Sequence, residues 1–293
     1  MWKNKILRAD FLLFLTAAIW GFAFVAQRVG MDYVGPYTFN GIRFLLGAVS
    51  LLPLYFIRQK NAKPKEENRK PLILGGIIAG LFLFGGSTFQ QIGLVYTSAG
   101  SGGFITSLYV VLVPLIIWLI WRKSPSVNVW IGAVLATVGL YFLSDPQSLD
   151  FKLGDILVLI STIFWAGHVI VIGKYSSKVD ALKLSIIQFL ICGLLSMLGA
   201  VIQEKIVWES IYLALIPILY GGLGSVGIAY TLQVFAQKHA HPTHAAIILS
   251  FESVFAAIGG YIILNEIMGV NAFIGCFLML VGVIIAQFKS FRK

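Results

Sequence analysis

Two charged residues, Glu252 and Arg43, lie inside long apolar runs of this 293-residue chain. In the centre of a bilayer a charged side chain costs at least roughly 2.5–3.5 kcal/mol, so such residues usually serve a function. A carboxyl that is withdrawn from water can exchange a proton, so we predict that Glu252 carries a coupling proton or contacts a solute. The alternative is a structural role, as an acceptor for polar neighbours or as the partner of Arg43.

Arg43 keeps its charge in a protein and must therefore be paired. The candidates for its partner are Glu252, backbone carbonyl oxygens and an anionic solute. We favour a structural role for Arg43.

Aromatic and amide side chains in other apolar runs form a second group of candidates. Trp20, Phe24 and Gln27 follow an i, i+4, i+7 spacing, which places them on one helix face, and Trp165 shares a face with His168. An aromatic wall with a few polar anchors suits an amphipathic or aromatic metabolite, or a cation held on ring faces. Core packing, lipid contact and, for His168, an interhelical hydrogen bond are the alternatives. The remaining predicted cavity residues are Gln90, Gln91, Tyr109 and Gln233.

Neither a metal site nor a cofactor site is predicted. His239, His241 and His244 lie close together in the sequence, but no cysteine or acidic residue lies beside them. Cys192 and Cys276 both lie in apolar runs, where a cysteine is typically a small core residue. The chain has no Walker motif, which indicates that ATP is not its energy source.

The composition predicts an all-α integral membrane protein. Hydrophobic residues make up 58% of the chain and charged residues only 12%, whereas soluble domains have about 25% charged residues. The net charge of +10 comes from basic residues in short loops between apolar runs, which is typical of membrane topology and argues against nucleic acid as a partner. A chain of this kind needs membrane lipid as its solvent.

Ten apolar runs are long enough to be transmembrane helices. The first run is long enough to span and matches a later segment, so we interpret it as a helix and not as a signal peptide. Lys and Arg are enriched in the cytoplasmic loops of membrane proteins. If both termini are cytoplasmic, only three basic loop residues lie on the outer side of the membrane, which favours this orientation. They are Arg28, Lys152 and Lys205. No soluble domain is predicted. The predicted spans are 11–29, 37–57, 72–95, 101–121, 127–144, 153–173, 182–202, 211–235, 244–264 and 270–288.

The second half of the chain repeats the first. Residues 127–139 align without gaps on 270–282, and single residues match at similar offsets, such as Trp20 with Trp165. We therefore predict two five-helix repeats, 1–145 and 146–293, and because five is odd the second is inverted. Inverted repeats can exchange conformations, which is the basis of alternating access. Glycines lie on one face of span 5 and on one face of span 10, which predicts that these two helices pack on each other. The alternative is that these glycines face other helices.

Other pairs related by the repeat include Asp10 with Asp155, Gln90 with Gln233, Tyr109 with Glu252, and Arg43 with Gln188.

Two stretches carry a resemblance to a known family. AAIWGFAF at Ala17–Phe24 and LSFESVFAAIGGYIILNE at Leu249–Glu266, together with the repeat, resemble the drug/metabolite transporter superfamily of the bacterial EamA type. The resemblance implies a central cavity lined by spans 1, 3, 4, 6, 8 and 9, with rocking four-helix bundles. The family often has Glu-Pro-Val where this chain has Glu252, Ser253 and Val254, so whether span 9 is kinked is left open.

The sequence therefore predicts a secondary transporter of a small organic metabolite, either an amino acid, a nucleobase-like solute or an amphipathic, aromatic one. We expect alternating access in a bacterial inner membrane, coupled to protons or facilitative, by a chain that acts as a monomer. The resemblance alone slightly favours export. A membrane enzyme is one alternative, although it would need an acidic pair, a metal cluster or a nucleophile group. A scaffold with a packed interior is the other.

Overall fold

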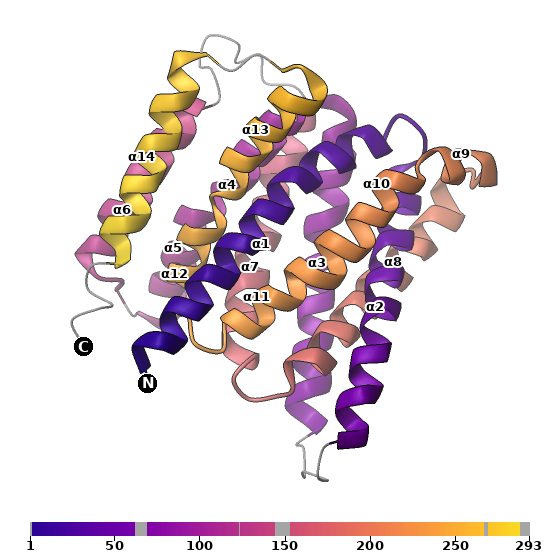
Figure 1. Ribbon diagram of the computed structural model, residues 1–293, viewed down its shortest axis with the longest axis horizontal. Helices are drawn as coiled ribbons and strands as arrows, with labels where there is room; N and C mark the ends of the chain where they lie inside the picture. Colours follow the sequence, from indigo (N-terminus) through magenta and orange to yellow (C-terminus); the bar gives the residue numbers. More distant parts are fainter. Residues whose placement is uncertain (1, 62–68, 123, 144–152, 267–268, 288–293) are drawn as a thin grey trace.

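The computed structural model describes residues 2–61, 69–122, 124–143, 153–266 and 269–287. Helices and the turns between them account for these ranges, in which no strand occurs. The helices lie side by side in one bundle, and α1 begins at the same end at which α14 finishes (Figure 1). The predicted all-α class is therefore confirmed.

The first half of the chain contributes α1 (Trp2–Gly30), α2 (Pro36–Asn61), α3 (Arg69–Tyr96), α4 (Ala99–Ser107), α5 (Tyr109–Trp121) and α6 (Val127–Leu143). The second half contributes α7 (Leu153–Tyr175), α8 (Ala181–Gln203), α9 (Trp208–Leu213), α10 (Leu215–Leu219), the π-helix η2 (Tyr220–Tyr230), α11 (Thr231–Ala236), α12 (Pro242–Leu249), α13 (Glu252–Leu264) and α14 (Val270–Gln287). Eight helical stretches are long and apolar enough to cross a membrane, and two shorter apolar helices, Val127–Gly139 and Phe273–Ala286, accompany them. The predicted count of ten spans stays a prediction.

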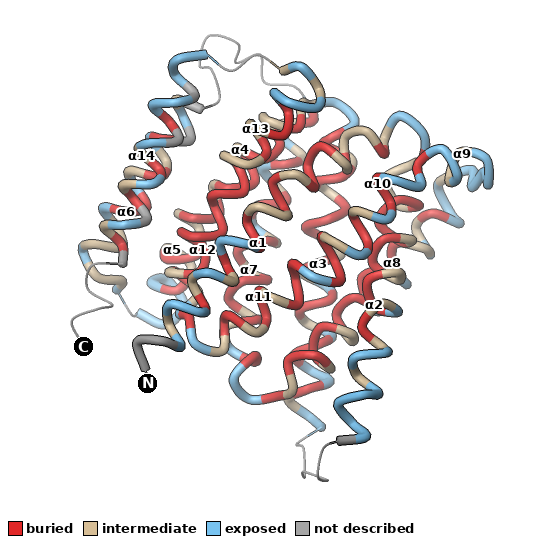
Figure 2. Tube along the Cα trace, in the orientation of Figure 1, coloured by how far each residue is buried: buried red, intermediate tan, exposed pale blue. Residues whose placement is uncertain are grey.

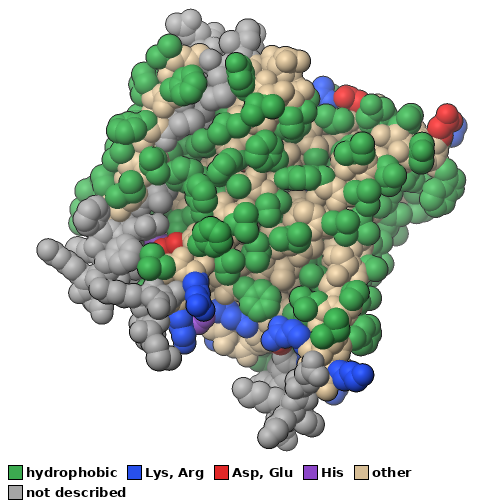
Figure 3. Space-filling view, viewed as in Figure 1, with side chains coloured by type: hydrophobic (Ala, Val, Ile, Leu, Met, Phe, Trp, Pro, Cys, Tyr) green, Lys and Arg blue, Asp and Glu red, His purple; other side chains and the backbone are tan. Residues whose placement is uncertain are grey.

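The outer surface is apolar around the middle of the bundle. Hydrophobic side chains cover the central part of the face in Figure 3, while Lys and Arg gather near the end at which α1 begins. The buried positions lie along the inner faces of the central helices (Figure 2). Large side chains such as Trp208 and Ile216 are 82% and 81% exposed, respectively. So much exposed apolar surface is unfavourable in water and suits contact with lipid.

Two of the long helical stretches are interrupted at equivalent positions. Leu108 separates α4 from α5, and Ser250 and Phe251 separate α12 from α13. Leu108 and Phe251 share the same backbone angles, φ −60° and ψ −13°. The residues that follow, Tyr109 and Glu252, each begin the next helix. The interruption before Glu252 therefore occurs without the proline that the resemblance associates with this position.

Helices α6 and α14 pack along each other through glycines. A Cβ atom added at Gly132 would lie 2.6 Å from the backbone oxygen of Gly282, and one added at Gly139 would lie 2.6 Å from that of Gly275. The predicted packing of spans 5 and 10 is thus confirmed. Elsewhere α3 packs along α7, α2 along α8 and α1 along α13, so helices from both halves surround the centre.

Replacing Gly132 by alanine is expected to destabilise this helix pair. The added methyl group would meet backbone, which cannot rotate away, and overpacking of this kind costs about 1–3 kcal/mol. Thermal unfolding of the purified protein in detergent should show a lower midpoint. The matched control is Gly269→Ala, because no heavy atom lies within 4 Å of a Cβ added there. An unchanged midpoint for Gly132→Ala would contradict the close contact.

Candidate functional site

A narrow cavity lies in the middle of the bundle, between helices of both halves. The cavity has a volume of about 30 Å³, which holds a water molecule but no metabolite. Its walls combine aromatic rings, amides, hydroxyls, an imidazole, one carboxyl and one guanidinium. The lining residues are Trp20, Phe24, Gln27, Arg43, Gln90, Thr106, Tyr109, Trp165, His168, Val169, Ser225, Tyr230, Gln233 and Glu252.

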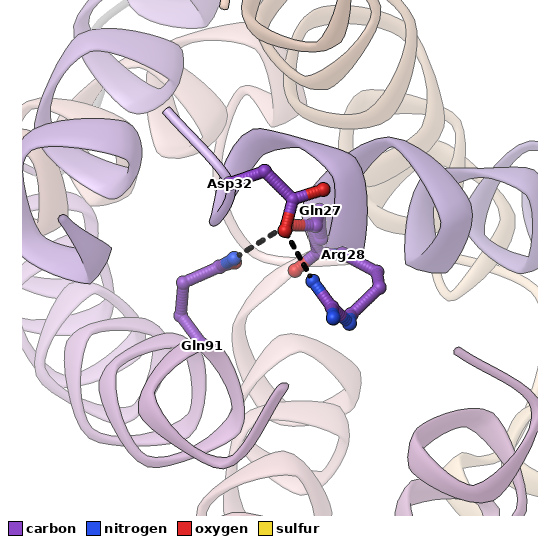
Figure 4. Close-up of polar contacts among 4 residues, drawn as sticks. All are labelled: Gln27, Arg28, Asp32 and Gln91. Carbon is purple, nitrogen blue, oxygen red and sulfur yellow. Dashed lines mark hydrogen bonds and ion pairs between the residues drawn. The ribbon is translucent and has the colours of Figure 1, made fainter. Parts of the chain in front are cut away.

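All the predicted site residues except Gln91 line this cavity. Gln91 lies behind the wall, where its Nε2 donates a hydrogen bond of 3.1 Å to the backbone oxygen of Gln27 (Figure 4). The next residue, Arg28, forms an ion pair with Asp32, four residues further along the chain, at 2.8 Å (Figure 4). The predicted cavity role of Gln91 is therefore replaced by a contact that ties α3 to α1.

Hydrogen bonds of the Gln27 and Gln90 amides and the Trp165 indole join three of the helices that form the cavity. Gln90 Nε2 donates to Gln27 Oε1 at 3.2 Å, and Trp165 Nε1 donates to Gln90 Oε1 at 2.8 Å. Gln27 Nε2 in turn donates to the backbone oxygen of Ala23 at 3.1 Å. Because each amide is held by its neighbours, this wall of the cavity, which spans α1, α3 and α7, has a fixed orientation.

Trp20 and Trp165, the pair related by the repeat, meet at one tyrosine. The Tyr230 ring lies 4.4 Å from the Trp20 ring and 6.1 Å from the Trp165 ring, measured between centroids, and it stacks on Trp165 at an interplanar angle of 26°. Trp20 Nε1 also donates to the backbone oxygen of Ser225 at 3.3 Å. The two tryptophans therefore face a common centre, as the repeat predicts.

Tyr230 and Ser225 belong to the π-helix η2, which sequence reasoning missed. π-Helical turns are rare and often lie at functional sites, since their wider turns move side chains and carbonyl oxygens out of α-helical register. Thr106 and Val169 are also lining residues that were not predicted. The signal that could have indicated η2 is its glycine content, with Gly221, Gly222, Gly224 and Gly227 in one short stretch.

Arg43 is buried without a carboxylate partner. Its Nε donates to Asn40 Oδ1 at 3.0 Å, and its guanidinium carbon lies 5.4 Å from the centre of the Phe39 ring and 5.0 Å from that of Phe44. Among the described residues no carboxylate oxygen lies within 4.0 Å of it. An ion pair with Glu252, one of the partners considered from the sequence, is therefore absent.

Several polar atoms of the cavity wall have no partner in the described part of the chain. They are Glu252 Oε1 and both amide atoms of Gln233. The hydroxyls of Tyr109 and Ser107 lie against the Glu252 carboxyl and act as its hydrogen-bond donors. A buried polar atom without a hydrogen bond costs about 1–3 kcal/mol, more if it is charged, so a molecule that supplied the missing bonds would be favoured here.

Three of the histidines form hydrogen bonds with other protein groups. His168 Nε2 forms a 2.8 Å hydrogen bond with Gln188 Oε1, which fits the interhelical alternative. The His241 side chain accepts a bond from the Thr243 backbone N–H, and His244 Nε2 lies 2.8 Å from Asp10 Oδ1. An acidic residue therefore does join this histidine group, brought in from α1. No group of three ligands for a metal occurs among the described residues.

The cysteines form no polar site that we can describe. The Cys192 thiol is buried, with its Sγ 3.5 Å from Ser87 Oγ, as expected for a core residue. The side chain of Cys276 lies outside the described part of the chain.

Polar contacts between the two halves lie at both ends of the bundle. At the end where α1 begins, Asp10 meets His244. At the other end, Thr97 Oγ1 donates to Asp155 Oδ1 at 2.6 Å, and the Gly100 N–H donates to a Glu266 carboxylate oxygen at 3.3 Å. Burial raises the pKa of the Glu266 carboxyl, and backbone N–H groups at the start of α4 counteract this effect. Recesses of about 340 and 430 Å³ adjoin these two ends.

The profile of the EamA-like transporter family matches the chain twice, over residues 7–145 and over residues 152–288. Together these stretches cover nearly the whole chain, and one lies in each of the predicted halves.

Curated relatives agree with this match. An uncharacterized transporter of Archaeoglobus fulgidus is 34% identical over 285 residues, covering 97% of this chain and 87% of its own length. The uncharacterized transporter YoaV of Bacillus subtilis is 26% identical over 285 residues, covering 94% of this chain and 95% of its own length. An S-adenosylmethionine uptake transporter of Rickettsia prowazekii is 27% identical over 230 residues, covering 76% and 73%. A crystal structure with 20% sequence identity shares the fold, with a TM-score of 0.76 over 97% of this chain and 98% of the other.

Proposed function

Because this chain belongs to the EamA-like transporter family, a family of membrane transporters and not of enzymes, we propose that it is a secondary transporter that carries a small organic metabolite through the central cavity by alternating access. The observation that carries this proposal is the cavity itself. It lies between the two halves and is lined by aromatic rings, amides, one carboxyl and one guanidinium. The match to a family of transporters over nearly the whole chain argues against a scaffold.

Alternating access is supported by the narrowness of the cavity. With about 30 Å³ of reachable space, this conformation excludes a metabolite, so a solute must enter and leave in others. The contacts at both ends join the two halves, and breaking one set or the other would open the cavity to one side. The double match to the family profile and the equivalent helix interruptions support a chain built from two inverted repeats.

The lining supports the substrate classes that the sequence suggests, which are amino acids, nucleobase-like solutes and amphipathic aromatic solutes. The Rickettsia relative is named for the uptake of S-adenosylmethionine, which combines a nucleoside with an amino acid.

We propose a bacterial inner-membrane location with cytoplasmic termini, since basic residues gather at the end where α1 begins (Figure 3). We propose that the chain acts as a monomer, since both repeats are present in it, and that export is the slightly favoured direction.

Glu252 is the proposed site of coupling to protons, and facilitated diffusion is the alternative. Its carboxyl is buried beside the Tyr109 and Ser107 hydroxyls, and one of its oxygens, Oε1, has no close hydrogen-bond partner in the described structure and could bind a proton or a cationic group in the cavity. Its position as the first residue of α13, after a helix interruption, places it where a conformational change would alter its surroundings.

Uptake by proteoliposomes tests both parts of this proposal. Radiolabelled amino acids, nucleobases and aromatic cations would be offered with and without an imposed pH gradient, to the wild type, to Glu252→Gln and to Glu209→Gln as an exposed carboxylate control. We expect uptake of at least one class, stimulated by the gradient in the wild type and in the control but not in Glu252→Gln. Uptake that ignores the gradient in every protein would establish a facilitator. No uptake of any class would contradict transport.

A further inference from the structure

The buried amide of Gln237 lies between the central cavity and the recess at the end of the bundle where α1 begins. We propose that Gln237 holds water molecules that connect Glu252 to this recess, so that the Glu252 carboxyl exchanges protons with the proposed cytoplasmic side while the cavity is closed. This inference rests on the proposed coupling at Glu252 and specifies the side of the membrane that supplies its protons.

The layer of protein between the cavity and this recess is thin. Tyr109 lines the cavity, and Ile117, eight positions later on the same helix α5, lines the recess. The two spaces are therefore about 12 Å apart along this helix, given its rise per residue. Gln233 lines the cavity, Gln237 follows it by one helical turn, and the chain then continues into residues 239–241, which line the recess.

Buried polar atoms without a partner follow this route. Gln237 is 2% exposed; its Nε2 donates to the backbone oxygen of Val169 at 2.9 Å, and its Oε1 has no hydrogen-bond partner in the described structure. On the cavity side, Glu252 Oε1 and both amide atoms of Gln233 lack a partner there as well, and on the recess side so does Thr243 Oγ1. Water molecules typically satisfy buried polar atoms of this kind, so a chain of water along these atoms would be stabilised.

Helix α7 runs beside the same route and shows how close its two ends are. Val169, which accepts the bond from Gln237, also lines the cavity. One helical turn later on α7, a Cβ atom added at Gly173 would meet the ring of Pro242, the residue before Thr243. Gln237 therefore lies about one turn of α7 from the start of α12, where the recess begins.

The opposite side of the cavity has an apolar residue at the equivalent position. Since the repeat pairs Gln90 with Gln233, Gln237 corresponds to Leu94, which is 0% exposed. Apolar surroundings of this kind do not hold water, so the route that we propose leads to one side only. The buried residues clustered with Leu94 are Phe24, Val25, Ala99 and Ala256.

Titratable groups lie at both ends of the route. At the recess they are His239, His241, His244 and Asp10, with Lys238 beside Gln237 in the chain, and at the cavity they are Arg43, Tyr109, His168, Tyr230 and Glu252. Gln237 does not itself titrate, so its role is to position water between these two groups.

Hydrogen–deuterium exchange of the Glu252 carboxyl tests the route without any solute. Infrared spectra of the purified protein in detergent would follow the shift of the carboxyl C=O band after transfer from H2O to D2O, with Glu252→Gln to identify the band. We expect Gln237→Leu to slow this exchange by about tenfold or more, since a water molecule that loses one buried hydrogen bond becomes less populated by about that factor. Gln237→Ser also lacks the bond to Val169 but leaves a hydroxyl and space for water, so it should exchange at least as fast as the wild type.

The matched control is Gln91→Leu. The Gln91 amide likewise donates one bond to a backbone oxygen of another helix and has an unpartnered Oε1, but it lies away from this route, so its replacement should leave the exchange rate unchanged. Equal exchange in Gln237→Leu and the wild type would overturn the inference. Equal slowing in Gln237→Leu and Gln237→Ser would also overturn it, because the lost bond to Val169 would then be the cause. If Gln237→Leu does not fold, Gln237→Met removes the same amide.

Uptake by proteoliposomes separates this inference from the proposed function. Gradient-stimulated uptake by the wild type, together with unslowed exchange in Gln237→Leu, would keep the coupling and exclude the route. Uptake that ignores the pH gradient would contradict the coupling itself, while slower exchange in Gln237→Leu alone would still support the route.

Discussion

Replacing Tyr230 by alanine is expected to abolish solute binding and to destabilise the protein by about 3–5 kcal/mol, the range found when a buried aromatic side chain is truncated. Its ring is the centre of the aromatic group that lines the cavity. The rings it contacts are Trp20, Phe44, Trp165, His168 and Phe189, which come from four helices. Without it, Trp20 and Trp165 lose the surface that holds them toward the cavity.

The control for this prediction is Tyr230→Phe, which keeps the ring and removes only the hydroxyl. Thermal unfolding in detergent should place Tyr230→Phe near the wild type and Tyr230→Ala well below it, and uptake by proteoliposomes should follow the same order. If Tyr230→Ala kept both its unfolding midpoint and its uptake, the aromatic group would not organise the site. Loss of uptake in Tyr230→Phe alone would instead indicate that the hydroxyl contacts the solute.

The cavity could be predicted from the sequence to the extent that its residues are rare in apolar runs. Arg43, Glu252 and Gln233 are identified in this way because the bilayer penalises their polar groups wherever they do not face a cavity or another helix. Tyr230 and Val169 carry no such signal, because aromatic and aliphatic residues are common in every membrane helix. The same limit applies to Ser225, whose contribution is a backbone oxygen that accepts a bond from Trp20.

Gln91 was predicted to line the cavity but contacts the α1 backbone instead, and this difference has a geometric cause. Neighbouring residues on an α-helix point about 100° apart, so Gln90 and Gln91 cannot both face one narrow cavity. Gln90 takes the cavity side and Gln91 turns to the α1 backbone. The helix register that decides between them depends on how α3 packs along α7, which is a tertiary property.

The partner of Arg43 also could not be identified from the sequence, because it depends on the structure around the side chain. Opposite charge suggested Glu252, which lies far away in the chain, whereas the structure pairs Arg43 with Asn40, three residues earlier on the same helix. An i, i+3 neighbour is within reach in any α-helix. The spacing of Asn40 and Arg43 in the sequence is compatible with this contact, but matching opposite charges does not identify Asn40 as the partner.

The largest effect on transport is expected from tying the two halves together at either end. One pair of cysteines would replace Asp10 and His244, and another would replace Thr97 and Asp155, each in a background with Cys192→Ala and Cys276→Ala. A reversible thiol cross-linker should reduce uptake to below about a tenth of its rate before cross-linking, because under the proposed alternating access a solute passes only if each end opens in turn. Treatment with a reductant should restore uptake.

The matched control joins Arg28→Cys to Asp32→Cys, two positions that form an ion pair between the last turn of α1 and the turn that follows it, and that cross no boundary between the halves. Its cross-linking should leave uptake unchanged, which separates a blocked conformational change from damage by the reagent. Blocking at only one end would indicate that the opposite contacts stay closed during transport and that the solute takes another exit. Full cross-linking at both ends with normal uptake would contradict alternating access, because the two halves could then not move apart at either side of the cavity.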